Sequence, residues 1–244
     1  MITLAKKGFS LVELLTVLAI IAILSALLAS NFGSLLSSNN FDAAINGISL
    51  TLTQARAYAL ARHTYVYVGL EEADATKASV PAAQTSVASP TVGGRVLMAA
   101  VASTDGTSGY SIYAPTAPAA SSLVQIQKLA VFNNVHLADL STVTTGNIAT
   151  RPTAGYQISD GTASMITFNL PLGAATPQCT FNMVIQFDPR GTAAVITTAG
   201  PLELTGLMEI GLEPTYGKAL PAKTPNLAAI QLEATTGEVQ IYRQ

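Results

Sequence analysis

Glu13 is the residue whose chemistry most needs an explanation. It is a carboxylate within an apolar run from Phe9 to Ala29, in which Ser10, Thr16 and Ser25 are the other polar residues. A charged side chain at the centre of a membrane helix costs about 2.5–3.5 kcal/mol and is usually retained where it has a partner or a role. Glu13 is therefore a candidate for ion pairing in apolar surroundings.

Residues suited to enzyme catalysis are few. His63 and His136 are the only histidines and lie far apart in the sequence, and the single cysteine, Cys179, falls in an expected strand. Neither a G-x-S-x-G nor an H-E-x-x-H pattern occurs. This residue set cannot build the usual zinc sites or an internal disulfide. We predict no catalytic residues, no metal site and no cofactor, and we expect that the chain is not an enzyme.

One acidic run could bind a hard cation such as calcium. Glu71, Glu72 and Asp74 supply three carboxylates within four positions, and calcium prefers oxygen ligands. The alternative is that these carboxylates lie in a polar loop and are solvated.

Length and composition indicate one packed globular domain with an anchor. The chain has 244 residues, of which 49% are hydrophobic and 11% are charged, a composition that argues against disorder. The net charge is −2 and the basic residues are scattered, so we expect no nucleic-acid partner.

The apolar run is long enough to cross a bilayer. As a helix, Phe9 to Ala29 would extend ~31 Å, about one hydrocarbon core. Lys6 and Lys7 precede it, and the next basic residue is Arg56, a charge bias that places the N-terminus in the cytoplasm. A cleaved secretory signal peptide is the alternative, although the run is longer than a typical signal core and no small-x-small cleavage pattern follows it.

The first residues carry a recognisable processing signal. Lys6 and Lys7, followed by G-F-S-L-V-E-L-L from Gly8 and then by an apolar helix, resemble the cleavage and methylation signal of type IV prepilins and type II secretion pseudopilins. The resemblance implies that a prepilin peptidase cuts after Gly8 and methylates the new N-terminal amine on Phe9. A glycine suits this position because the backbone must enter a tight protease cleft.

The same resemblance implies a partner for Glu13. Cleavage makes it the fifth residue of the mature chain, where its carboxylate would pair with the Phe9 ammonium of a neighbouring subunit. Each charge alone is costly in lipid, whereas the pair is neutral and sets the register of stacked helices. The alternative is a Glu13 that reaches the cytoplasmic interface without a partner.

Beyond the apolar run, the sequence predicts a second helical stretch and then β-structure. Asn31 to Asn40 is polar and contains Gly33, which predicts a joint, and apolar residues at helical spacing from Phe41 predict an amphipathic helix that ends near Arg62. Strand-like segments follow: 64–68, 95–102, 110–113, 124–133, 165–169, 180–187, 192–197, 207–212, 228–232 and 238–242.

Two hairpin turns are strongly indicated. Asp188, Pro189 and Gly191 stand where a type I turn favours them, and the segment 235–237 (T-T-G) separates the last two apolar runs. In this order, QARAYALARHTYVYV, VIQFDPRGTAAV and IQLEATTGEVQIYR resemble the corresponding segments of H-type minor pseudopilins and of the related minor pilins. The resemblance covers residues 8–68 and 183–243.

The middle of the chain does not share this resemblance. Residues 71–94 and 103–122 are rich in Ala, Ser, Thr, Pro and Gly. We expect long surface loops there, either with contact specificity or as passive insertions.

Together these observations predict an α+β protein with a type IV pilin-like fold, in which a long N-terminal helix packs on a mainly antiparallel β-sheet or β-sandwich domain. The expected parts are a leader peptide (1–8), a transmembrane and polymerisation helix (9–30), its amphipathic continuation (31–62) and a periplasmic β-rich domain (63–244).

The expected function is that of a minor pseudopilin, a structural subunit of a periplasmic pseudopilus that supports protein export by a type II secretion-like system. A minor pilin of a surface type IV pilus, serving initiation, adhesion or DNA uptake, is the first alternative. A secreted β-sandwich binding protein released by signal peptidase is the second. The resemblance implies a single-pass protein of the bacterial inner membrane, with other pilin-type subunits, prepilin peptidase, an inner-membrane assembly platform, and the secretin or secreted cargo as partners.

Overall fold

A computed structural model describes residues 10–79, 83–87, 91–108, 118–158, 166–197, 200–201, 206–221 and 226–244. The side chains of residues 26–38, 197, 200 and 201 are not described. The chain divides into two compact units, Met1–Asn39 and Asn40–Gln244. The helix α1 (Leu11–Arg62) begins in the first unit and ends in the second.

The first unit consists of helix in its described part, and its apolar side chains face solvent. The exposed fraction exceeds one half for ten large apolar residues between Leu11 and Leu24, for example 80% for Leu11 and 58% for Leu18. The backbone remains helical through residues 31–40, so the joint predicted there is not a break in the helix. Among the described residues, no helix is both long and apolar enough to span a membrane.

The part of α1 in the second unit is amphipathic, as predicted. Its buried stripe has exposed fractions of at most 1% and consists of Phe41, Ala44, Ile45, Ile48, Leu52, Ala55 and Ala59. The helix ends at Arg62, because His63 adopts a left-handed backbone conformation (φ 51°). The Thr64 amide then donates to the Ala59 carbonyl at 3.3 Å, the bond pattern that closes many helix C-termini.

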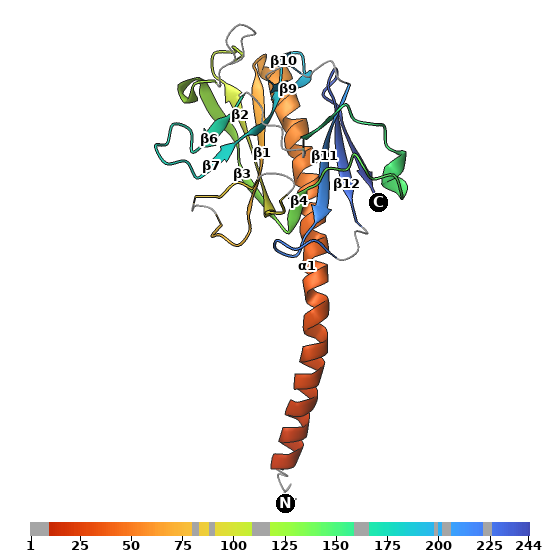
Figure 1. Ribbon diagram of the computed structural model, residues 1–244. Helices are drawn as coiled ribbons and strands as arrows, with labels where there is room; N and C mark the ends of the chain where they lie inside the picture. The colour runs from red at the N-terminus through yellow and green to blue at the C-terminus, as the bar shows by residue number, and fades with distance from the viewer. Residues whose placement is uncertain are drawn as a thin grey trace, which may run out of the picture. The chain divides into compact units, whose positions relative to one another are not determined.

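A six-stranded antiparallel sheet forms one layer of the second unit (Figure 1). Its order is β10-β9-β8-β1-β2-β3. The strands are β1 (Val66–Asp74), β2 (Gly94–Ser103), β3 (Leu123–Asn133), β8 (Met183–Phe187), β9 (Ala193–Thr197) and β10 (Gly200–Pro201).

A smaller sheet of order β13-β12-β11-β4 forms the other layer. Its strands are β4 (Val135–Leu137), β11 (Leu207–Pro214), β12 (Ala228–Glu233) and β13 (Val239–Arg243). A short strand, β5 (Tyr156–Gln157), pairs with β11 in parallel. The remaining elements are the pair β6 (Phe168–Leu170) and β7 (Cys179–Phe181) and the 3-10 turns η1 (Ala120–Ser122) and η2 (Asn147–Thr150).

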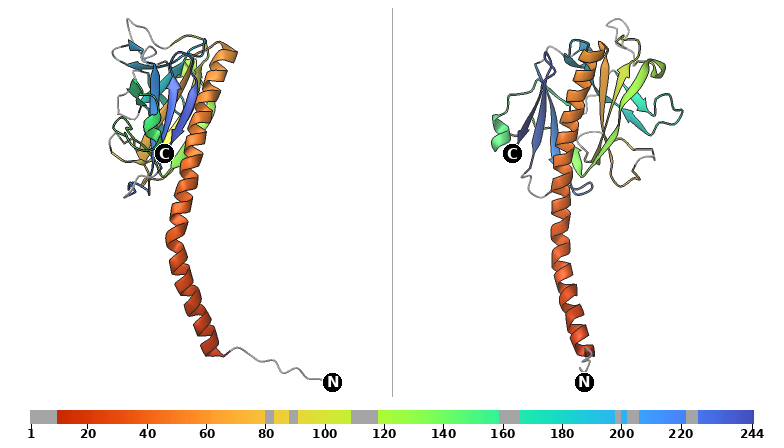
Figure 2. Two further views of the ribbon diagram at one scale, coloured as in Figure 1. Left: turned by 90° about the vertical axis from the view of Figure 1, so that its right-hand side faces the viewer. Right: turned by 180° about the vertical axis from the view of Figure 1, so that it is seen from behind.

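Three apolar clusters hold the second unit together. The largest lies among the inner faces of the two sheets and the buried stripe of α1, and Figure 2 shows this part of α1 against both sheets. A second cluster joins the other face of the large sheet to β6 and β7, with the rings of Phe168 and Phe181 4.9 Å apart. The third, around Leu140 and Ile148, covers the outer face of the small sheet. Because both faces of β1 and β2 are covered, these strands are buried almost throughout.

The structure confirms most of the predicted strands and corrects two points. Residues 180–187 form two strands in different sheets, β7 and β8, with Asn182 between them. The short strands β4, β5 and β10 were not predicted, since two or three residues show no periodicity. The strand predicted at 110–113 lies outside the described residues.

The segment 71–94 is less loop-like than its composition indicates. Residues 71–74 belong to β1. Residues 83–87 fold back beside them, since the Asp74 amide donates to Thr85 O at 3.0 Å and the Val87 amide to Glu72 O at 2.8 Å. Arg95, 5% exposed, holds the intervening turn by donating to Gln84 Oε1 at 2.8 Å and to the Lys77 carbonyl at 3.3 Å.

Candidate assembly site

The first turn of α1 carries the charged residue of the candidate assembly site. The Ser10 amide donates to Glu13 Oε2 at 2.9 Å, and the Glu13 amide donates to Ser10 Oγ at 3.2 Å. This reciprocal pair is a capping box, which satisfies two amides that a helix start otherwise leaves without partners. A carboxylate near the positive end of the helix dipole is also favourable. Glu13 thus has a structural role within its own chain.

The capping box has a local sequence signature. Ser10-Leu11-Val12-Glu13 follows the S-x-x-E pattern directly before an apolar run. The other predicted residues of this site, Lys6, Lys7, Gly8 and Phe9, lie outside the described residues. The site therefore consists, in its described part, of the Ser10–Glu13 pair within an exposed apolar surface.

The predicted turn after β8 is present and fully hydrogen-bonded. The Gly191 amide donates to the Asp188 carbonyl at 2.9 Å. The Asp188 carboxylate accepts from the amides of Arg190 and Thr192 at 2.8 and 3.0 Å, and from Arg190 Nε at 2.9 Å. Burial alone would raise the pKa of Asp188, but these hydrogen bonds outweigh it and lower the pKa. Turn formation accounts for this residue.

Both predicted turns meet at the C-terminal end of α1. Gly191 and Gly237 have left-handed backbones, with φ of 84° and 68°. A Cβ at Gly237 would clash with the Gly191 carbonyl, and a Cβ at Gly191 would come within 3.1 Å of Leu60. The Ala193 amide also donates to the Ala234 carbonyl at 2.7 Å. The three segments that carry the second resemblance are therefore neighbours in the fold.

The acidic run at the end of β1 is not one site. The Glu72 carboxylate is buried and accepts from the amides of Gly93 and Leu137 at 2.6 and 2.9 Å, with His136 Nδ1 2.9 Å from both of its oxygens. Glu71 accepts instead from the Asn182 amide at 3.2 Å.

Asp74, the third member of the run, bonds Thr76 and Lys218. In the part of the chain that the structure describes, no group of three or more His, Cys, Asp or Glu side chains is arranged to hold a metal ion. The three carboxylates of the run have separate protein partners.

Cys179, His63 and His136 likewise do not come together in one site. Cys179 is buried in β7, and burial raises the pKa of its thiol to about 11. His63 ends α1, whereas His136 is paired with Glu72 at the junction of the two sheets. A thiol with a raised pKa is a poor nucleophile at neutral pH.

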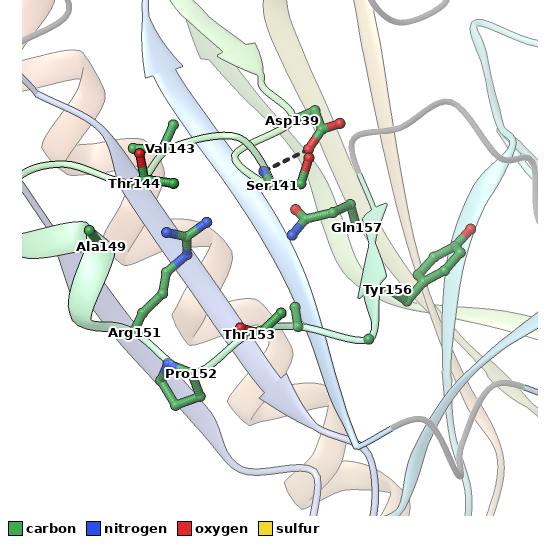
Figure 3. Close-up of a pocket in the computed structure, with 12 residues that line it drawn as sticks. Asp139, Ser141, Val143, Thr144, Ala149, Arg151, Pro152, Thr153, Tyr156 and Gln157 are labelled. Carbon is green, nitrogen blue, oxygen red and sulfur yellow. Dashed lines mark hydrogen bonds between the residues drawn. The ribbon is translucent and has the colours of Figure 1, made fainter.

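Sequence reasoning missed a polar pocket on the outer face of the small sheet. Residues 138–155 leave the sheet after β4 and return at β5, and they line an open cavity of about 490 Å³ (Figure 3). Arg151 anchors this excursion through a bidentate pair with Glu209, at 2.7 and 3.0 Å. The partners lie 58 positions apart, and no local pattern relates them.

Comparison with known proteins identifies the N-terminal segment. Residues 4–29 match the family model of the prokaryotic N-terminal methylation motif. The match is consistent with a type IV prepilin-like protein and supports a protein of pilin or pseudopilin type, a class whose subunits are processed by prepilin peptidase and assemble with other pilins. No curated protein and no solved structure matches the chain.

Proposed function

We propose that the chain is a minor pseudopilin, a structural subunit that enters a short periplasmic filament and supports protein export by a type II secretion-like system. The observation that supports this most is the methylation motif at residues 4–29 together with Glu13 at the first turn of an exposed apolar helix. In this proposal the function is assembly, and the chain is not an enzyme.

The exposed side chains of the first unit support an assembly role. Large apolar residues of a soluble protein rarely form extended exposed surfaces, and where they do they mark membrane or protein contacts. Here they occur all around the helix from Leu11 to Leu24, so lipid and neighbouring pilin helices are both suitable environments. In the proposed topology the N-terminus is cytoplasmic, this helix is in the inner membrane, and the second unit is periplasmic.

In this proposal Glu13 has one partner within its own chain and a second partner on a neighbouring subunit after cleavage. Its carboxylate accepts from the Ser10 amide in the described chain, and after cleavage at Gly8 it would pair with the methylated Phe9 ammonium of a neighbouring subunit. An ion pair in lipid is favourable only when both charges are compensated. Pairing between subunits would therefore fix the axial register of the filament.

The α+β architecture of the second unit agrees with a type IV pilin-like fold, which we include in the proposal. The buried stripe of α1 packs between two antiparallel sheets, and the outer loops remain available for partners such as other pseudopilins, the assembly platform, the secretin or cargo.

The first experiment is N-terminal mass analysis of the protein from its native membrane, with and without active prepilin peptidase. We expect a chain that starts at a methylated Phe9 and that is lost without the peptidase. A chain that starts near Asn31, or that keeps Met1 in both strains, would contradict the proposal.

Two substitutions separate the capping role of Glu13 from its pairing role. Glu13→Gln keeps the capping box, because glutamine also serves at this position, but removes the charge. Ser10→Ala removes the cap and keeps the charge. We expect Glu13→Gln to abolish chemical cross-linking of the protein to neighbouring pilin-type subunits in native membranes and Ser10→Ala to reduce it only slightly. The reverse order would show that Glu13 acts as a helix cap alone.

A deletion strain distinguishes secretion from a surface pilus. Loss of the gene is expected to reduce the secreted fraction of exported proteins and to leave surface pili and their retraction unchanged. Loss of surface pili with normal secretion would favour the minor pilin alternative.

A further inference from the structure

Two edge strands of the second unit differ in how well they are protected from pairing with another chain. The large sheet ends on one side at β3, whose pairing with β2 has register shifts and whose exposed Lys128 lies in the middle of the strand. Bulges and lysines of this kind discourage edge-to-edge pairing. The small sheet ends on one side at β13, which has a continuous register with β12 and contains neither proline nor lysine. β13 is therefore the less protected edge.

The hydrogen bonds of β13 show which of its backbone groups lie at the free edge. The Gln244 amide donates to the Leu227 carbonyl at 3.0 Å, and the Glu233 amide donates to the Glu238 carbonyl at 2.9 Å. The register is unbroken between these two bonds, so the even-numbered residues of this segment bond β12. In an antiparallel pair such residues alternate with residues whose N–H and C=O groups point the other way. The free edge consequently presents the backbone groups of Val239, Ile241 and Arg243.

The free backbone groups of β13 have no hydrogen-bond partner among the described residues. An extended strand of another chain supplies partners for such a row of donors and acceptors. The side chain of Ile241 is 41% exposed and lies on the same face of the strand as Val239 and Arg243. Val239 packs against the main apolar cluster and Arg243 pairs with Asp42 of α1, so this face is turned toward α1.

The helix α1 runs beside β13 and gives this edge a charge (Figure 2). At one end of β13, Arg243 compensates Asp42. At the other end, the Arg56 side chain lies against Gly237, since a Cβ at Gly237 would come within 2.9 Å of Arg56 Cδ. Arg56 is half-buried, and in the described part of the chain no carboxylate forms an ion pair with it. The start of β13 thus lies next to a cation that no described carboxylate neutralises.

We propose that β13 is a docking edge for an extended segment of a partner protein. The segment would add as a strand antiparallel to β13, with an apolar residue opposite Ile241 and a carboxylate opposite Val239, on the side of Arg56. Main-chain hydrogen bonds would supply the affinity, and these two side chains would supply the specificity. The proposal rests on the second unit alone and does not depend on the filament function.

A second copy of the chain suits this edge less well. Antiparallel pairing of two β13 strands about Ile241 would place Arg243 of the second copy opposite Val239, beside Arg56, and like charges that meet across strands are unfavourable. Specific interfaces also involve about 20–30 residues on each side, many more than the five residues of β13. A partner segment with a carboxylate at that position brings opposite charges together instead.

An amide NMR titration of the full-length protein in a zwitterionic micelle tests the proposal. The probe is the peptide T-T-V-T-E-T with blocked ends, whose valine would lie opposite Ile241 and whose glutamate would lie opposite Val239. We expect saturable shifts of the β13 amides at roughly millimolar peptide. Methylation of the valine and glutamate amides, which face β13, should abolish these shifts. Methylation of the threonine amide between them, which faces away, should not.

Variants of the protein locate the edge and test the charge. Ile241→Pro removes an amide that makes no bond to β12, so the sheet is retained, and binding should weaken at least about tenfold. Gln125→Pro is the matched control, because its amide likewise faces away from the neighbouring strand, in β3, and it should leave binding unchanged. Arg56→Met should weaken binding of the glutamate peptide about fivefold and leave binding of the matching glutamine peptide unchanged.

The absence of β13 shifts with the unmethylated peptide would overturn the proposal. Equal binding of the two methylated peptides would also overturn it, and this comparison needs no change in the protein. Shifts that are lost in Gln125→Pro but kept in Ile241→Pro would assign strand addition to β3 instead. Broadening of the β13 amides as the protein concentration rises without peptide, abolished by Ile241→Pro, would assign the edge to a second copy.

Discussion

Residues of the same type have opposite environments in the two units of the chain. Leu18 is 58% exposed in the first unit, whereas Leu52, on the same helix, is fully buried in the second. Carboxylates differ similarly, since Glu13 has one capping partner while Glu209 accepts four hydrogen bonds, from Arg151, Gln157 and Gln231. Leu52 and Glu209 have their contacts within the second unit, whereas the exposed apolar side chains of the first unit are suited to contacts from outside the chain.

The largest expected effect concerns the ion pair of the second unit. Arg151→Met leaves Glu209 buried without its cation, and breaking one side of a buried pair costs about 3–5 kcal/mol. Arg190→Met is the matched control, because Arg190 is 81% exposed and its partner Asp188 keeps hydrogen bonds from the backbone amides of residues 190 and 192. Loss of an exposed cation should cost about 0–1 kcal/mol. Urea unfolding followed by tyrosine fluorescence measures both, since the chain has no tryptophan.

Equal losses of unfolding free energy in the two arginine variants would contradict this prediction, because they would show that burial of the Arg151–Glu209 pair carries no extra cost.

An acid titration of the wild type tests the direction in which Glu209 changes stability with pH. Burial alone would raise the pKa of Glu209, but hydrogen bonds from Arg151, Gln231 and Gln157 lower it below its usual value. Its contribution to stability is therefore present above the unfolded-state pKa and is lost as the pH falls through the lower folded-state pKa. The Arg151→Met variant should lose less stability over that acid range.

The second effect contrasts the two leucines directly. Leu52→Ala removes a fully buried side chain and should lower the free energy of unfolding of the second unit by about 2–5 kcal/mol. Leu18→Ala removes an exposed side chain and should leave it unchanged. The same urea unfolding experiment in a lipid-like micelle reports both, and a loss of stability in Leu18→Ala would show that the first unit contributes to the stability of the second.

Periodicity and turn chemistry predicted much of this fold. The spacing from Phe41 to Ala59 defined the buried face of α1 because a helix repeats every 3.6 residues. Asp188 and Gly191 defined a hairpin because few residues suit those positions. Such signals are local, so one segment of sequence contains all the information that they require.

The polar interior was not predictable in the same way. Glu72 and His136 are 64 positions apart, and Arg151 and Glu209 are 58 apart, so only the pairing of strands brings them together. The Ala-, Ser-, Thr- and Pro-rich composition of residues 71–94 predicts a loop for Glu71 and Glu72, yet both lie in β1, where backbone amides compensate their carboxylates. The pocket of residues 138–155 depends on such distant pairs and for that reason had no sequence signal.

A smaller effect on stability is expected for Glu213, which tests whether every carboxylate of the second unit has its charge compensated by hydrogen bonds or a cation. Burial, as the main cause, raises the pKa of Glu213, and its Oε1 has no hydrogen-bond partner among the described residues. A folded-state pKa above the unfolded value of 4.5 means that stability falls as the pH rises through that interval. Glu213→Gln should therefore stabilise the protein at neutral pH.

The gain in Glu213→Gln should disappear at acid pH, where the wild-type carboxyl is protonated. Glu238→Gln, at an exposed position just before β13, is the control and should give no such gain. A gain that is equal at both pH values would mean that the ionised carboxylate of Glu213 is not the cause.

The smallest effect concerns a carboxylate at the surface of the second unit. Hydrogen bonds from the Thr76 hydroxyl and amide, and then from Lys218, lower the pKa of Asp74 to about 2. Because the Thr76 hydroxyl is the largest cause, Thr76→Val should raise this pKa more than Lys218→Met does, and carboxyl chemical shifts in an NMR titration measure both. If the lysine variant moves the pKa more, the charge of Lys218, 3.1 Å from Asp74, and not the hydrogen bond from Thr76 sets the ionisation of Asp74. Asp74 would then resemble Glu209, which is paired with a cation of its own chain, more closely than Glu13, whose hydrogen bond comes from a backbone amide.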